Sequence, residues 1–108
     1  MRLRVEYFDQ NESLAASLPR EGRVERELQF TDSRGPWFLV KLDAPLSYQG
    51  SPYSRLLLMS RWDGVPVGGN EPTSAFVLLV PQGVVPSPSH SFKGFPHVAW
   101  ARVVTLNP

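Results

Sequence analysis

The residues best suited to chemistry in this sequence are aromatic side chains in segments where aromatic residues are not expected. Residues 44–52 and 82–96 are rich in Ser, Gly and Pro, yet they contain or adjoin several rings. Aromatic side chains beside a basic neighbour supply much of the binding energy of protein interfaces. The rings either bind a partner or fill the open end of a β-barrel, and the sequence leaves both interpretations open. The candidate binding residues are Tyr48, Tyr53, His90, Phe92, Lys93 and Phe95.

Metal and catalytic chemistry have weaker support in the sequence. The two histidines, His90 and His97, have no motif spacing that joins them to a carboxylate, so we expect no metal site and no cofactor. The chain has no cysteine, which excludes a thiol nucleophile and disulfides. Serines surround His90, but neighbours in sequence do not define the geometry of a catalytic pair, and a G-x-S-x-G motif is absent. We therefore assign no catalytic residue.

Nucleic-acid binding is the alternative that the sequence keeps open. Small barrels bind single strands by stacking bases on aromatic rings beside basic side chains. Arg55 and Arg61 are expected on the same strand face as Tyr53, and Lys93 lies between Phe92 and Phe95. Against this interpretation, 11 basic and 10 acidic residues leave a net charge of only +1.

Length and composition indicate one small β domain over residues 1–108. A chain of 108 residues is too short for two independent cores. Its 11 prolines and 8 glycines suit short strands joined by turns. The N-terminal segment has no apolar signal-peptide core, and no apolar run reaches the ~18 residues of a membrane span. We expect a soluble, cytoplasmic protein.

Residues 53–64 are the stretch around which the other strands are expected to be arranged. Alternate side chains of a strand face opposite sides. Leu56, Leu58 and Trp62 then share one face, and Tyr53, Leu57 and Met59 share the other. A strand that is apolar on both faces is expected in the centre of a sheet, with both faces covered. An Asp-Gly pair at 63–64 ends it.

Five further segments have strand patterns, and one short segment has a helical pattern. The helix is expected within 9–18, with Asp9 as N-cap and Leu14 and Leu18 packed on the sheet. Between the strands we expect loops at 44–52, 63–74 and 82–96. This pattern predicts an all-β fold with one short helix after the first strand, in a small antiparallel barrel or sandwich. The strands are expected at 2–8, 22–30, 37–43, 53–62, 75–80 and 97–106.

The alternation also predicts which side chains form the core. Val24, Leu28 and Phe30 are expected to face inward with Arg26 among them, and the rings of Trp62 and Trp100 are placed in the core. Residues 75–80 are apolar throughout, which is explained either by a homodimer or by complete burial within one chain.

Chain order suggests where a binding surface would lie. In an up-and-down meander the first, third and fifth connections share one end of the barrel, which would bring the candidate aromatic residues together there. We therefore predict a non-catalytic binding or protein–protein interaction module, such as an accessory or inhibitor-like protein. Its partner would be another protein, with no membrane role. A small nucleic-acid-binding barrel is the alternative, and an enzyme is the third choice.

Overall fold

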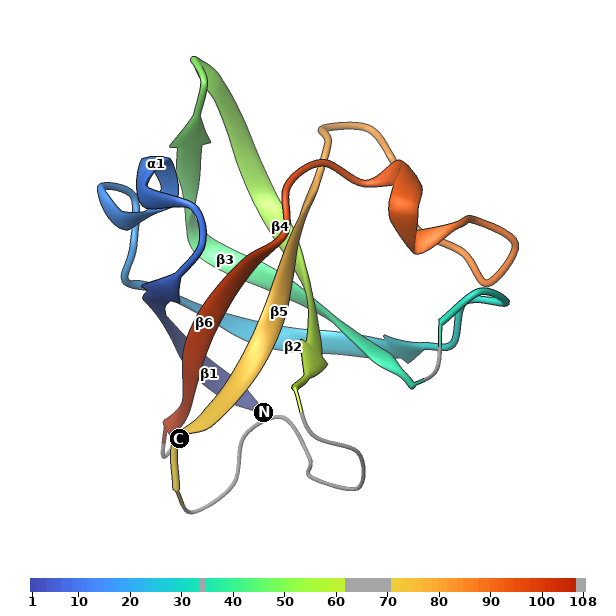
Figure 1. Cartoon of the computed structure of the whole chain (residues 1–108), viewed down its shortest axis with the longest axis horizontal. Helices are drawn as coiled ribbons and strands as arrows, with labels where there is room; N and C mark the ends of the chain where they lie inside the picture. The colour runs from blue at the N-terminus through green and yellow to red at the C-terminus, as the bar shows by residue number, and fades with distance from the viewer. Residues whose placement is uncertain (34, 62–70, 107–108) are drawn as a thin grey trace.

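The protein folds into a closed antiparallel barrel of six strands in the order β1-β2-β3-β4-β5-β6 (Figure 1). The computed structural model describes residues 1–33, 35–61 and 71–106. The all-β fold, the short helix after the first strand and the antiparallel barrel are confirmed. No helix in these ranges is long and apolar enough to cross a bilayer. The elements are β1 Arg2–Asp9, α1 Glu12–Ala15, β2 Arg20–Leu28, β3 Trp37–Tyr48, β4 Ser51–Ser60, β5 Thr73–Val80, the 3-10 helix η1 Phe92–Gly94, and β6 Ala99–Leu106.

One apolar cluster fills the barrel interior, and we call it the interior cluster. Side chains from every strand point into it because alternate residues of each strand face the barrel axis. Its members include Leu3, Val5, Val40, Leu56 and Leu58, all 0% exposed. Leu14 of α1 joins the cluster, and Leu18 packs against it, as the sequence predicted. The helical segment therefore covers one end of the barrel.

A second apolar cluster lies on the outside of the barrel, and we call it the outer cluster. The strands contribute their other faces to it, and residues 81–96, here called the strap, cover it. Leu57 and Leu78 are almost completely buried there, so β4 and β5 are covered on both faces within one chain. The apolar run at 75–80 is thus explained without a second copy. The outer cluster consists of Leu28, Phe30, Trp37, Leu39, Leu57, Met59, Leu78, Val80 and Phe95.

The expected loop at 44–52 is wrong, because these residues extend β3 and β4 into a long hairpin. The turn is made by Gln49 and Gly50, both with positive φ (50° and 79°). Pro45 and Pro52 suggested loop boundaries, since proline donates no hydrogen bond to a β-ladder. Pro45 falls in an irregularity of the β3–β4 pairing between Lys41 and Leu46, and Pro52 is paired with Ser47.

The helix is shorter than expected and begins later. It spans Glu12–Ala15, and its N-cap position is Asn11, without a side-chain capping bond. Asp9 instead ends β1, and its carboxylate accepts a hydrogen bond from the Gln10 amide at 2.8 Å. Pairing of β1 with β6 extends to Asp9 and outweighs the local helix-start pattern.

Two predictions of inward-facing residues are also wrong. A register shift between Val24 and Arg26 turns Arg26 outward, so Leu28 and Phe30 join the outer cluster while Val24 packs on the interior. On β6, the small residues Ala99, Ala101 and Val103 face inward. Trp100 is therefore outside, half-buried, because the narrow interior of a six-stranded barrel is already filled.

Two predictions on the central strand have separate outcomes. Tyr53 packs against the interior cluster and not with Leu57 and Met59, which belong to the outer one. The strand is irregularly paired near this residue. Trp62 and most of the predicted loop 63–74 lie outside the described residues.

Candidate functional site

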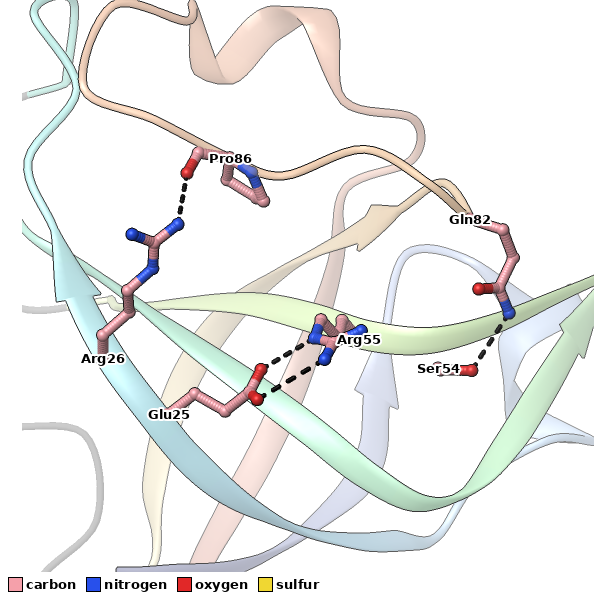
Figure 2. Close-up of polar contacts among 6 residues, drawn as sticks. All are labelled: Glu25, Arg26, Ser54, Arg55, Gln82 and Pro86. Carbon is pink, nitrogen blue, oxygen red and sulfur yellow. Dashed lines mark hydrogen bonds and ion pairs between the residues drawn. The ribbon is translucent and has the colours of Figure 1, made fainter.

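The strap is fastened to the outer face of the barrel by polar contacts from separate strands. Figure 2 shows the Gln82 amide donating to the Ser54 hydroxyl of β4 at 3.0 Å. Four residues further along, the Arg26 guanidinium of β2 donates to the Pro86 carbonyl at 2.6 Å. The Leu79 amide donates to the Pro96 carbonyl near the other end of the strap. These contacts set the path of a segment that has little regular structure.

Asp32 anchors the middle of the strap. Its carboxylate accepts hydrogen bonds from the Ser91 hydroxyl and, at 3.3 Å, from the Phe92 amide. The Ser91 hydroxyl bond is the largest cause that lowers the pKa of Asp32, and the Phe92 amide and the Lys93 charge add to it. Ser91 in turn accepts from the Lys93 amide at the start of η1. The ionised carboxylate therefore holds η1 in place.

Aromatic packing completes the attachment of the strap. Phe95 is only 8% exposed, and its ring lies 5.9 Å from that of Phe30. Phe92 is half-buried and stacks on Trp37, with ring centroids 5.7 Å apart and planes at 29°. The strap is thus part of the fold and also presents a partly exposed ring.

A hollow of about 440 Å³ opens beside the Phe92–Trp37 stack, and we call it the aromatic hollow. Most of its lining is apolar, and Asp32 and Ser33 provide the polar groups. The Ser33 hydroxyl accepts a hydrogen bond from the Trp37 indole N–H at 2.9 Å, which fixes the orientation of that ring. Its lining residues are Asp32, Ser33, Trp37, Met59, Phe76, Phe92 and Val98.

The six candidate residues from the sequence divide into two groups. The strap carries His90, Phe92, Lys93 and Phe95, of which only Phe92 lines the aromatic hollow. Phe95 lies in the outer cluster, while His90 and Lys93 are exposed. The two tyrosines lie elsewhere, towards the barrel interior.

Tyr48 belongs to a polar network near the helix end of the barrel. Its hydroxyl lies 3.1 Å from His97 Nδ1 and accepts from the Asn11 side chain at 3.3 Å. Tyr48 is 5% exposed, and it does not line the aromatic hollow. Its contacts are those of a residue that closes the barrel.

The meander places the odd connections at one end of the barrel, as Figure 1 shows for α1, the β3–β4 turn and the start of the strap. The strap then lies along the outer face, because Asp32 and Arg26 hold it there. Tyr48 and Tyr53 thus pack towards the barrel interior, while the other four candidate residues lie on the strap.

The sequence interpretation missed most residues of the aromatic hollow. Trp37, Met59 and Phe76 come from the neighbouring strands β3, β4 and β5, and the strand register places Met59 directly opposite Phe76. The sequence indicated that neighbouring strands have a second apolar face, which must be buried. It did not indicate that residues 81–96 are the segment that covers this face.

Within the described ranges, no cluster of three or more His, Cys, Asp or Glu residues could hold a metal ion. Neither a family model, nor a curated protein, nor a solved structure matches the chain.

Proposed function

We propose that this protein is a non-catalytic binding module whose aromatic hollow receives a large apolar or aromatic side chain of a partner protein. The observation that supports the proposal is the hollow itself, about 440 Å³ in volume with a mainly apolar lining. Binding sites for apolar groups are typically concave, with a few polar groups that fix orientation. Asp32 and Ser33 are suited to that orienting role.

Barrel closure favours recognition through side chains. Each strand is paired with two neighbours over at least part of its length, so among the described residues no strand lies at the edge of an open sheet, where a partner strand would add. Val98 lines the hollow and is 43% exposed, and the half-buried Phe92 lies across from the strands. A hollow lined by such residues is suited to an anchor residue of the kind that dominates interface energy.

The proposal is tested by selecting peptides from a random display library against the purified protein. The informative variant is Val98→Glu, which places a charge in the hollow. Its matched control is Val85→Glu, the same substitution at a more exposed valine (71%) that does not line the aromatic hollow. Both variants should keep the wild-type Tm, because surface substitutions usually change stability by less than about 0.5 kcal/mol.

We expect selected peptides to share an aromatic or large aliphatic anchor. They should lose at least tenfold in affinity for Val98→Glu, equivalent to about 1.4 kcal/mol, and little for Val85→Glu. Equal binding to wild type and Val98→Glu would contradict the proposal.

Salt dependence separates this function from the nucleic-acid alternative. Apolar anchoring should change little between low and physiological salt, whereas phosphate contacts weaken steeply as salt increases. Anisotropy titrations of a selected peptide at two NaCl concentrations make the comparison. A steep loss of peptide affinity would disagree with an apolar anchor.

A further inference from the structure

Four basic residues form a row across neighbouring strands on the outer face of the barrel. The register pairs Arg2 of β1 with Arg23 of β2, Arg23 with Lys41 of β3, and Lys41 with Arg55 of β4. Neighbouring strands are about 4.8 Å apart, so each side chain has a like charge directly beside it. Like charges in directly opposed positions of a sheet are destabilising. We call these four residues the basic row. A negative charge beside them would reduce the repulsion.

Acidic side chains supply that charge at the two ends of the row. Arg2 pairs with Asp43, and its guanidinium also lies 3.8 Å from the Glu21 carboxylate. At the other end, Glu25 of β2 reaches over β3 to Arg55 at 2.7 Å, as Figure 2 shows. This contact is the largest cause that lowers the pKa of Glu25.

The centre of the row is not compensated in the same way. Among the residues that the structure describes, the side chains of Arg23 and Lys41 make no hydrogen bond or ion pair within 4 Å. At longer range, Lys41 and Arg23 make minor contributions to the lowered pKa of Glu25, and Arg23 also contributes to the lowered pKa of Asp43. Arg23 is exposed and Lys41 is half-buried, so both can be reached by a ligand from solvent.

A hollow of about 240 Å³ lies at these central residues, lined by Arg2, Arg23, Lys41, Leu42 and Asp43. The one carboxylate in this lining, Asp43, already accepts two hydrogen bonds from Arg2. The hollow therefore combines two cations without a close partner and a third that is fixed by its own ion pair.

A second hollow, of about 300 Å³, continues from the other end of the row beneath the strap. Its charged lining residues are Glu25, Arg26 and Arg55. Arg26 also donates to the Pro86 carbonyl and is held in position by it (Figure 2). Basic side chains thus extend from Arg2 on β1 to Arg26 beside the strap.

We propose that the basic row binds a phosphate-type oxyanion, seated between Arg23 and Lys41. Such an anion accepts charge-assisted hydrogen bonds from a guanidinium and an ammonium together. It would also offset the repulsion between these two neighbours. The site does not depend on the aromatic hollow or on the function proposed for it.

Two sources carry this chemistry, a free phosphate and the backbone of a single-stranded nucleic acid. We distinguish them with inorganic phosphate, followed in ¹H–¹⁵N spectra, and with a fluorescent oligothymidine, followed by anisotropy across a NaCl series. The test variant is Arg23→Gln with Lys41→Gln. The control is Lys93→Gln with Arg102→Gln, which removes the same charge from exposed positions outside the row. Arg23→Gln alone serves as a second test variant if the double variant is unstable.

We expect phosphate to shift amide signals around residues 23 and 41 in the wild type and the control, and not in the test variant. If the source is a nucleic-acid backbone, the oligonucleotide also binds. The slope of log affinity against log salt then becomes shallower by about 1.4 in the test variant, or 0.7 for each of two lost contacts. Phosphate shifts without oligonucleotide binding would identify a small phosphorylated ligand.

The proposal is overturned if neither probe binds the wild type at millimolar concentration. It is also overturned if both double variants lose binding equally, which would indicate a general charge effect. Loss in the control alone would place the anion near Lys93 or Arg102 and remove the basic row as the site.

Discussion

The interior and outer clusters are both apolar and well buried, but they are enclosed in different ways. Hydrogen-bonded strands enclose the interior cluster on every side, and α1 covers one end. The outer cluster is covered by the strap, which is fastened by a few side-chain bonds and by Phe92 and Phe95. Burial alone therefore does not distinguish the two clusters. What differs is the kind of cover, because strand pairing encloses the interior cluster whereas a few side-chain contacts hold the strap over the outer cluster, where the candidate binding hollow lies.

The largest expected effect is a loss of stability on truncating either of two adjacent residues, one in each cluster. Leu56 and Leu57 are both 0% exposed, the first in the interior cluster and the second in the outer one. Leu56→Ala should cost about 4–5 kcal/mol, because the closed barrel cannot collapse into the cavity. Leu57→Ala should cost about 2–3 kcal/mol, because the strap can move inward. Urea unfolding of both variants measures the difference, and equal costs would contradict the comparison.

The next effect concerns the two phenylalanines of the strap. Phe95→Ala should cost about 3 kcal/mol because its ring is buried against Phe30. Phe92→Ala should cost roughly 1 kcal/mol, the value of an aromatic pair, because its ring is half-buried on Trp37. Thermal unfolding of each variant gives the values. A larger loss for Phe92→Ala would assign it the role of a core residue.

A smaller effect is expected for Trp100 on the outer face of β6. Its ring stacks on Phe76 at 3.7 Å, with the Arg61 guanidinium 4.6 Å from the ring centroid. Trp100→Ala should cost about 1–2 kcal/mol, from loss of the aromatic pair and the cation–π contact. A cost near 4 kcal/mol in chemical denaturation would restore the sequence-based prediction that Trp100 is a core residue.

The smallest effect is the pH dependence of the strap contact at Asp32. The folded-state pKa lies below its ordinary value, chiefly because of the Ser91 hydroxyl bond. The contact therefore contributes to stability above the unfolded pKa, near 3.9, and the contribution is lost as the pH falls through the lowered folded value. Asp32→Asn should have a lower Tm than wild type at pH 6, and the difference should shrink at lower pH.

Glu27 is an exposed carboxylate on β2, and Glu27→Gln provides the control. Its Tm should follow that of the wild type across the same pH range. A constant difference between Asp32→Asn and wild type at every pH would show that ionisation of Asp32 does not hold the strap.

The fold class was predictable because hydrophobic alternation is a local signal. Alternation along each strand predicts its two faces, and the number and spacing of the strands predict a small antiparallel barrel or sandwich. The errors occurred where pairing with a neighbouring strand outweighed local preference. Pro45 and Pro52 were accommodated in a hairpin, and a shift near Arg26 reversed the facing of the rest of β2.

The candidate site was less predictable than the fold, because its residues meet only when the strand register is set and the strap is in place. Phe92 could be identified as an aromatic residue in a loop, but its neighbours Trp37 and Phe76 come from two strands that are separated by β4. The basic row depends on strand register, which a shift of one residue would have changed. The pattern of residues along one strand does not show its register with the neighbouring strands.

The pairing that closes the barrel has a consequence for the partly folded chain. Arg2 of β1 lies opposite Leu106 of β6, so this contact joins residues nearly the whole chain apart. Until β6 docks, β1 and β5 are two open edges with unpaired amides and carbonyls, and such edges are templates for aggregation. Contacts of this separation also slow folding. Pairing of β6 with β1 thus converts an aggregation-prone open sheet into a closed barrel.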